Sequence, residues 1–181
     1  MLTRKEVREA QRRALGFFEK AHIALTPKEK KGMEVADFGL GDLARTGLQV
    51  VVYVNTERVC AKELILFPRQ TCPEHRHPSI NGQPGKEETF RCRWGTVYLY
   101  VPGEKIAKPH AAPPRGKEAY YTVWHEVVLR PGGQYTLPPN TLHWFQGGAR
   151  GAVLSEFSTK SVDEKDIFTD PEIRRIPELA K

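Results

Sequence analysis

The 181-residue chain is 39% hydrophobic and 28% charged, which predicts one globular domain with a sizeable core and excludes a disordered chain. No apolar run approaches the roughly 20 residues of a membrane-spanning helix, so we expect no membrane insertion. The net charge of +6 is spread along the chain without interleaved stacking aromatics, so we expect no nucleic-acid partner.

The N-terminal segment is predicted to be a helical arm. Residues 3–22 carry apolar side chains at helical spacing, and Thr3 and Glu6 form the pattern of a capping box at its start. Residues 37–45 are expected to form a short helix or an irregular turn. The charged, amphipathic N-terminus lacks the apolar core of a signal peptide, so the expected location is the cytoplasm.

Short strands dominate the rest of the chain, because apolar runs alternate with turn residues. The strands are predicted at residues 48–55, 58–67, 88–101, 119–129, 134–137, 142–146 and 151–158. Gly95 is a candidate break within the third strand. In the fourth strand, His125 alternates with valines and is expected to face a barrel interior, as a satisfied core residue or a sugar contact. Asp170 and Pro171 then begin a predicted short C-terminal helix.

A helical arm followed by many short strands predicts an all-β fold, either a sandwich or a barrel. We expect a single domain over residues 1–181, with the arm at 1–45, the barrel core at 46–160 and a C-terminal segment at 161–181. Residues 102–118 are rich in Pro, Gly, Ala and Lys. They are expected to form a long loop, either a plain surface loop or a lid near the barrel mouth.

Cysteine and amide content bear on the source of the protein. The three cysteines, Cys60, Cys72 and Cys92, are too few for a disulfide scaffold and match no Cys-x-x-Cys zinc pattern. We expect them to be buried small side chains, with one internal disulfide as the alternative if the source is a hyperthermophile. Only three Asn and six Gln occur beside abundant Lys, Arg, Glu and Pro, which favours a thermophilic, heat-stable protein.

Three histidines and one glutamate form the most informative pattern in the sequence. His75 and His77 are one residue apart, so an extended strand directs both imidazoles to one face. His143 and Glu88 supply a third imidazole and a carboxylate. This set suits a divalent transition metal, which acts as a Lewis acid and leaves positions for substrate oxygens. The pattern therefore favours an enzyme.

These four residues lie in two segments, residues 71–95 and 132–148. The first segment resembles the first motif of the cupin superfamily, whose members are jelly-roll β-barrels with a metal in the mouth. That motif is His-x-His, a Glu, six residues and a Gly. It corresponds here to His75, His77, Glu88 and Gly95. The usual gap between the second His and the Glu is three or four residues, and here it is ten. The six-residue spacing to Gly95 favours Glu88 over Glu87, which would point to the opposite face of the strand.

The second segment resembles the second cupin motif, which is Gly, five residues, Pro-x-Gly, two residues and His. The matching residues are Gly132, Pro138, Asn140 and His143. Asn140 stands where Gly is usual, and Asn also accepts left-handed backbone geometry. The resemblance implies a cupin jelly-roll barrel for this chain.

Two longer strings resemble the D-lyxose isomerase family within the cupins. They are GKEETFRCRWGTVYLYVPGE (85–104) and SEFSTKSVDEKDIFTDP (155–171), and the resemblance extends over roughly residues 30–178. It implies an Mn²⁺-dependent isomerase, with Co²⁺ as another possible ion, that interconverts D-lyxose with D-xylulose and commonly D-mannose with D-fructose. The expected partners are a monosaccharide substrate and a second copy of the chain in a homodimer.

Isomerisation needs a base that moves a proton between C2 and C1 through an enediol. Glu156, on the strand after His143, is the best candidate, because a partly desolvated carboxylate can have its pKa raised towards neutral. Lys86 is two residues before Glu88, so a regular strand directs it to the same face. There it can stabilise the developing enediolate oxygen. Asp166 and Asp163 are candidates for binding distal hydroxyls, because they lie in the second family string.

Other functions remain open at the level of sequence. A sugar-phosphate isomerase would suit the positive charge, although no compact group of phosphate-binding side chains lies near the motifs. A non-haem iron dioxygenase and a non-catalytic sugar-binding cupin are further alternatives, since one fold hosts many chemistries. His110, in the Pro-rich loop, is expected to be a plain surface residue.

Overall fold

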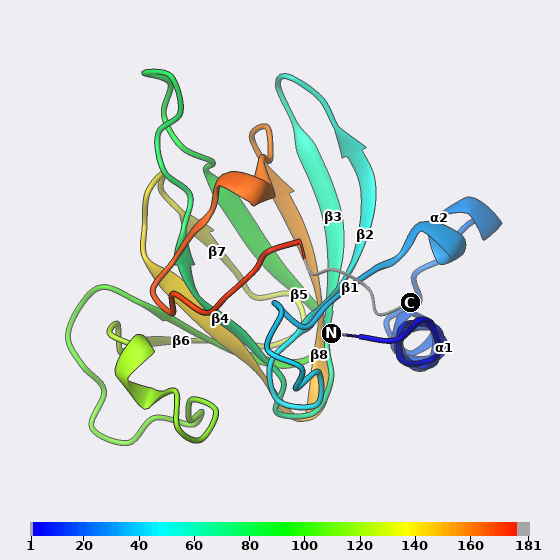
Figure 1. The fold of residues 1–181 in the computed structure, drawn as a ribbon, viewed down its shortest axis with the longest axis horizontal. Helices are drawn as coiled ribbons and strands as arrows, with labels where there is room; N and C mark the ends of the chain where they lie inside the picture. Colours follow the sequence, from blue (N-terminus) through cyan, green and yellow to red (C-terminus); the bar gives the residue numbers. More distant parts are fainter. Residues whose placement is uncertain (1, 177–181) are drawn as a thin grey trace.

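The strands curl into one barrel, which Figure 1 shows from the side of the C-terminal segment. The computed structural model describes residues 2–176. Its strands are β1 (Glu34–Ala36), β2 (Leu48–Asn55), β3 (Cys60–Leu66), β4 (Thr71–Arg76), β5 (Glu88–Val101), β6 (His125–Leu129), β7 (Gln134–Leu137), β8 (His143–Ser158) and β9 (Ile167–Phe168). The predicted all-β fold is confirmed, and of the two architectures the barrel is correct. The N-terminal segment also contains β1, which was not predicted.

Strands β5 and β8 are the long elements that join the two sides of the barrel. β8 pairs with β3 through its second half, with β4 through its first half, and with β5 along most of its length. The two strands predicted at 142–146 and 151–158 are therefore one strand. Gly95 does not end β5, but the register shifts on either side of it. A Cβ at Gly95 would lie 2.1 Å from the Gly151 carbonyl oxygen, so only glycine fits.

Alternation along the strands separates an apolar interior from an outer face. Inward side chains such as Leu64, Leu154, Phe90 and Phe145 are 2% exposed or less and form the main core. Burying each such side chain contributes about 1.5–3 kcal/mol. The core fills the barrel below its mouth and fixes the strands that carry the site.

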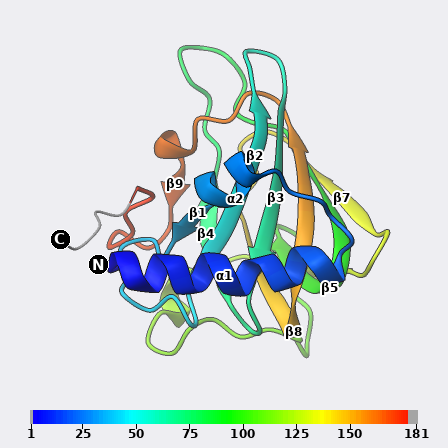
Figure 2. The same ribbon diagram turned by 90° about the vertical axis from the view of Figure 1, so that its right-hand side faces the viewer.

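Helix α1 (Arg4–Lys20) covers part of the outer face, as Figure 2 shows. Thr3 and Glu6 form the predicted capping box, and Phe17 packs edge-on against Trp94 with ring centroids 5.6 Å apart. The predicted N-terminal helix is confirmed. No helix in the described part of the chain is long and apolar enough to span a membrane.

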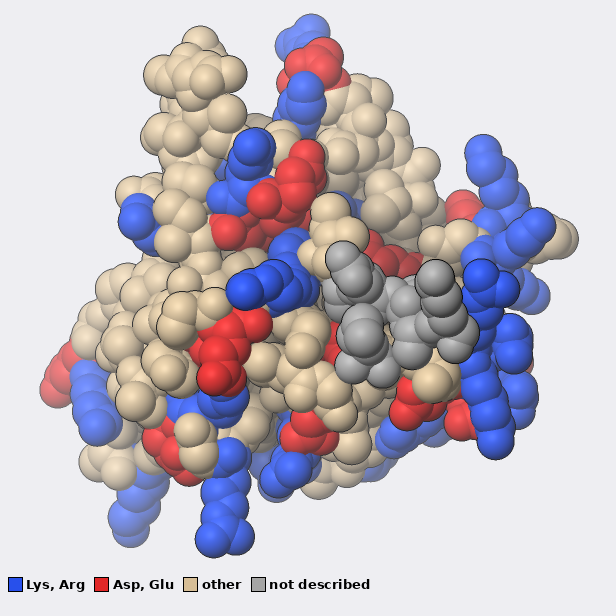
Figure 3. Space-filling view, viewed as in Figure 1, with Lys and Arg blue, Asp and Glu red and all other residues tan. Residues whose placement is uncertain are grey.

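A second short helix, α2 (Pro27–Gly32), follows with its own capping box of Thr26 and Glu29. Lys and Arg side chains gather along the right-hand edge of the molecule in Figure 3, over these two helices. Residues 37–45 form turns, so of the two predicted alternatives the irregular turn is correct.

The strand predicted at 119–129 is wrong in its first half. Residues Glu118–Tyr120 form a 3₁₀ turn and only β6 is a strand. The reason is Glu74, whose carboxylate accepts the Thr122 and Val123 amide hydrogens at 2.6 and 3.0 Å, so no neighbouring strand can bind them. His125 is exposed, with Nδ1 3.2 Å from the Glu104 carbonyl oxygen. The prediction that it faces the interior is wrong.

The predicted C-terminal helix is also wrong as far as the structure describes the chain, because residues 170–176 form turns. Asp170 accepts the Glu172 amide hydrogen at 2.9 Å and pairs with Lys117 at 2.8 Å. The Arg174 amide donates to the Phe38 carbonyl oxygen at 2.8 Å. These contacts replace the bonds of a helix. Residues 177–181 of that prediction lie outside the described residues.

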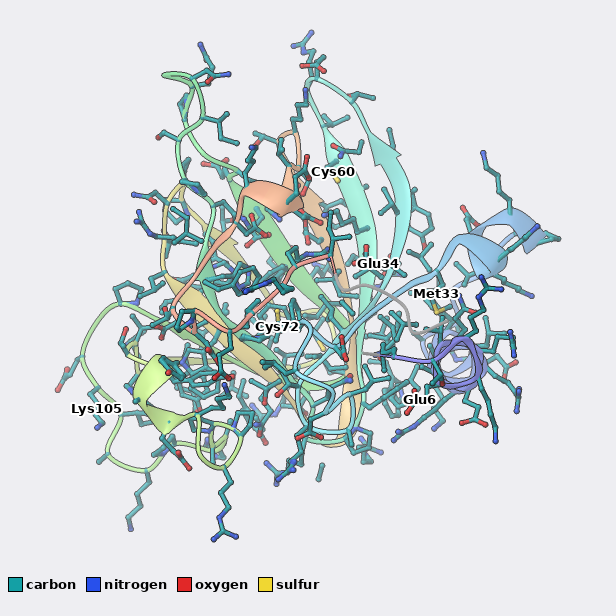
Figure 4. The ribbon with its side chains drawn as sticks, viewed as in Figure 1. Glu6, Met33, Glu34, Cys60, Cys72 and Lys105 are labelled. Carbon is teal, nitrogen blue, oxygen red and sulfur yellow. The ribbon has the colours of Figure 1, made fainter. Side chains whose placement is uncertain are left out.

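The cysteines are buried small side chains, as predicted, and residues 102–118 form the expected long loop. All three cysteines are buried and free, and Figure 4 shows Cys60 near one end of β3 and Cys72 near the centre of the barrel. His110 is exposed as predicted. It holds residues 102–118 against β6, because its Nδ1 lies 2.7 Å from the Glu126 carboxylate. The loop is thereby fixed to the barrel wall.

Candidate active site

Three buried histidines converge at the mouth of the barrel. His75 is the next-to-last residue of β4, His77 follows that strand, and His143 begins β8 directly opposite His75. One ring nitrogen from each lies within 4.8 Å of the others, which is close enough for a shared metal ion. Two strands that are far apart in sequence thus bring the three imidazoles together.

Backbone carbonyl oxygens hold the rings of His75 and His143 through their Nδ1 atoms. His75 Nδ1 lies 2.7 Å from the Pro73 carbonyl oxygen, and His143 Nδ1 lies 3.0 Å from that of Thr141. Carbonyl oxygens only accept, so both Nδ1 atoms carry the proton and each Nε2 keeps a free lone pair. The buried Nε2 of His143 has no hydrogen-bond partner among the described residues. This arrangement fits metal ligation, in which second contacts orient each imidazole.

Glu88 reaches the same point from the start of β5. Its Oε1 lies 3.1 Å from Nε2 of both His77 and His143, and its side chain is 1% exposed. Glu87 is exposed instead. The ten-residue gap before Glu88 forms a loop with a bridge between Ile80 and Gln83. The chain then returns to the barrel and brings the carboxylate of Glu88 next to the histidines.

Burial and neighbouring charges both shift the pKa values of the groups at the site. Burial lowers the pKa of His77, but the Glu88 charge and the Asp166 hydrogen bond outweigh it and raise this pKa to about 9. Burial would raise the pKa of Glu88, but Lys86 and His77 hold it well below its ordinary value. Burial and the neighbouring histidines hold the pKa of His75 low. A carboxylate and imidazoles arranged in this way suit a divalent transition metal.

Lys86 and Glu156 lie beside this cluster. The ammonium Nζ of Lys86 is 2.7 Å from Glu88 Oε2 and 3.0 Å from Glu156 Oε1. Both side chains are about 5% exposed. Burial would lower the pKa of Lys86, but the charges of Glu156 and Glu88 raise it well above its ordinary value. A protonated lysine therefore connects the two carboxylates.

Asp166 contacts a histidine as well as the cavity. Its Oδ1 lies 2.5 Å from His77 Nδ1. Phe168, on β9, stacks on the ring of His75 with centroids 5.2 Å apart. Asp163 lies farther along the cavity, where it pairs with Lys62 and Arg175. The C-terminal segment therefore crosses the mouth of the barrel and closes one side of the site (Figure 1).

The predictions did not include Lys62, Phe168 or Arg175. All three line the same cavity. Lys62 had a recognisable signal, because it is two residues before Leu64 and so shares its inward face. A charged residue at an inward position of a strand indicates a site. Phe168 and Arg175 had none, since only the fold brings the C-terminal segment back over the mouth.

The cavity between the histidines, the carboxylates and the lysines is small, but a larger hollow lies beside it. The cavity has a volume of about 30 Å³, which is room for a water molecule. A hollow of about 740 Å³ adjoins it, lined on the inner side by His77, Lys86 and Asp166. This hollow provides a route from solvent to the ligand-bearing face.

Residues 17–181 match the model of the family described as D-lyxose isomerase. The chain belongs to the D-lyxose isomerase family. Among relatives, the D-lyxose/D-mannose isomerase of Thermosediminibacter oceani is 66% identical over 179 residues, which are 99% of each chain. The D-lyxose ketol-isomerase of Cohnella laeviribosi is 65% identical over 172 residues, which are 95% of this chain and 94% of the relative. The predicted membership of a family of sugar isomerases is confirmed.

Solved structures support the fold of this family member. The L-ribose isomerase of Cellulomonas parahominis superposes with a TM-score of 0.81 and covers 99% of this chain and 98% of its own. Its sequence is 18% identical, so this likeness concerns the fold alone. The predicted cupin barrel is confirmed by it together with the observed strands.

Proposed function

We propose that this protein interconverts D-lyxose with D-xylulose, and D-mannose with D-fructose, by proton transfer through an enediol. The observation that carries the proposal is a buried carboxylate, Glu156, held next to three converging imidazoles and Glu88. Relatives named D-lyxose/D-mannose isomerase and D-lyxose ketol-isomerase share 63–66% of their residues with this chain. Family and site thus point to one reaction class.

His75, His77, Glu88 and His143 would hold the metal ion. The ion, which we propose is Mn²⁺ with Co²⁺ as an alternative, supplies a Lewis acid for the carbonyl and hydroxyl oxygens of the open-chain sugar. The oxygen and nitrogen ligands of this set suit either ion. Asp166 orients His77 through Nδ1, and its other oxygen is proposed to bind a sugar hydroxyl.

Glu156 is proposed as the base that carries the proton between C2 and C1. Its contacts with Lys86, Lys62 and Ser158 all involve Oε1. Among the described residues this leaves Oε2 without a hydrogen bond and able to accept a carbon-bound proton. Lys86 is proposed to stabilise the negative charge on the enediolate oxygen, because its ammonium group is already oriented by two carboxylates.

The sugar-phosphate alternative has less support. A phosphate group needs cations that are free to contact it. The cations of the cavity are instead paired, Lys86 with Glu88 and Glu156, Lys62 with Asp163, and Arg175 with Asp163 and Glu34. A free sugar, which offers hydroxyls and no charge, suits this balanced interior better.

A coupled ketose assay tests the proposal with D-lyxose, D-mannose and mannose 6-phosphate, in the presence and absence of Mn²⁺. Glu156→Gln is expected to reduce turnover by about 10²–10⁴-fold while the bound metal is retained. Glu57→Gln, an exposed control with 83% of its side chain accessible, is expected to remain active. Preference for the phosphate, or full turnover in Glu156→Gln, would refute the assignment. Sugar binding without turnover would indicate a sensor, and oxygen uptake with Fe²⁺ a dioxygenase.

Three further properties are proposed. Homodimer formation follows from the family resemblance and is tested by the sedimentation of the purified chain. Heat stability follows from the low content of Asn and Gln, and calorimetry measures it. A cytoplasmic location is proposed because the three cysteines are free thiols, as is usual in a reducing compartment, and fractionation of the source cells tests it.

A further inference from the structure

Lys62 lies on the inner face of β3, directly across the sheet from Glu156 on β8. Its Nζ is 3.8 Å from Glu156 Oε1, 2.8 Å from Ser161 Oγ, and 2.8 and 3.0 Å from the two oxygens of Asp163. The side chain is 4% exposed. A lysine buried this deeply is rare and needs partners.

The lysine is charged in this position. Burial would lower the pKa of Lys62, but the charges of Glu156 and Asp163 outweigh it and raise this pKa above its ordinary value. Asp163 and Ser161 occupy its hydrogen-bonding positions, so the ammonium group has little left for a substrate oxygen. Its remaining charged neighbour is Glu156.

We propose that Lys62 is a positioning residue for the base, which together with Lys86 holds Oε1 of Glu156 and leaves Oε2 for the substrate. This inference rests on the proposed role of Glu156. Two cations, Lys62 from β3 and Lys86 from the loop before β5, contact the same carboxylate oxygen. The carboxylate is thereby fixed in one orientation.

Glu156 lies among several charged groups. Lys62 and Lys86 contact Oε1, and Ser158 donates a hydrogen bond to the same oxygen at 3.3 Å. Glu88 shares Lys86 with Glu156, and Asp163, on the 3₁₀ turn Asp163–Lys165, is paired with Lys62 and Arg175. Phe90, opposite Glu156 on β5, is apolar. Removing Lys62 therefore removes one of the two cations that hold Oε1.

A purely structural role for Lys62 would be to neutralise Asp163. Lys62→Met together with Asp163→Asn separates the two roles, because the double variant leaves no unpaired charge at residue 163. Asp163→Asn alone is the matched control, and Lys62→Arg retains the positive charge. The kcat and KM values for D-mannose are measured separately in all of them. The bound Mn²⁺ is measured in parallel, so that loss of the metal is distinguished from a misplaced base.

The proposal predicts that kcat falls by about 10-fold or more in the double variant relative to Asp163→Asn, because a misplaced base is less efficient, while KM and the bound Mn²⁺ stay unchanged. Lys62→Arg should stay near wild type. Equal kcat values in the double variant and its control would overturn the proposal. Turnover that survives Glu156→Gln would instead overturn the assignment of the base, so the two failures are distinguishable.

Discussion

The two ends of the barrel interior are built from the same strands but from different side chains. Strands β3 and β8 pair Leu64 with Leu154, and two residues farther along each strand they pair Lys62 with Glu156. All four side chains face the barrel interior. The apolar end gains free energy from burial. The charged end has to offset the desolvation of its ions, and replacing buried ions with apolar groups is often neutral or stabilising. The difference indicates that the apolar end maintains the fold and the charged end is retained for chemistry.

The largest expected effect comes from making the charged end apolar. In Lys86→Met/Glu88→Leu/Glu156→Leu, turnover should fall by at least about 10²-fold, since the proposed base and a proposed metal ligand are lost. The free energy of unfolding should stay equal or rise by about 1–4 kcal/mol, because the lysine and both carboxylates that it pairs with are removed together. Ketose formation and urea unfolding measure the two quantities. A loss of more than about 2 kcal/mol would mean that these ions support the fold.

Truncation at the apolar end should have the opposite result. Leu154→Ala removes a side chain that is 0% exposed and should lower the free energy of unfolding by about 2–5 kcal/mol. Phe157→Ala, with a ring on the outer face that is 49% exposed, is the matched control and should change it by about 0.5 kcal/mol or less. Equal losses in the two variants would show that the barrel interior is not the source of stability.

A smaller effect is expected where the C-terminal segment meets the histidines. Asp166→Asn keeps the shape of the side chain but removes the charge that holds His77 Nδ1. Metal affinity should fall by about 10- to 100-fold, as measured by competition with a chelating dye. Glu164→Gln, at an exposed position on the same segment, should bind as wild type does. Unchanged affinity in Asp166→Asn would restrict that residue to a role in substrate binding.

The smallest expected effect is on the pH dependence of stability, and it comes from the outer face of β3. Glu63, on the outer face beside inward Lys62, is buried with Oε2 lacking a hydrogen-bond partner among the described residues, and burial raises its pKa from 4.5 to about 7. The folded state therefore holds a proton that the unfolded state releases between these values. Stability from this group is complete below pH 4.5 and is lost as the pH rises through 7.

Glu63→Gln removes that titration. The variant should lose less stability than wild type between pH 5 and pH 8, by about 2 kcal/mol after allowance for solvent screening. Urea unfolding at the two pH values measures the difference. If the free energies of unfolding of the two proteins change equally with pH, Glu63 does not hold an extra proton in the folded state.

Periodicity and spacing predicted most of the framework. The capping box at Thr3 and the alternation in residues 48–67 depend on local sequence, and the structure shows the helix and the strands there. His75, His77, Glu88 and His143 could be grouped from their types and spacing, and the structure places them together. Local signals sufficed because each strand presents its inward side chains at every second residue.

Prediction failed where distant parts of the chain determine the backbone. Residues 119–124 alternate like a strand, but the buried carboxylate of Glu74 binds their amides. Asp170-Pro171 resembles a helix start, but Lys117 and Phe38 hold this segment in turns. No window of sequence contains these partners, since the fold alone brings them together.

The central claim is that one cation binds between three imidazoles and one carboxylate at the barrel mouth. Anomalous X-ray diffraction at the manganese edge, from crystals of the Mn²⁺-loaded protein, tests it most directly. The account predicts one strong peak within bonding distance of His75, His77, Glu88 and His143. A peak elsewhere, or none in crystals of active protein, would contradict it.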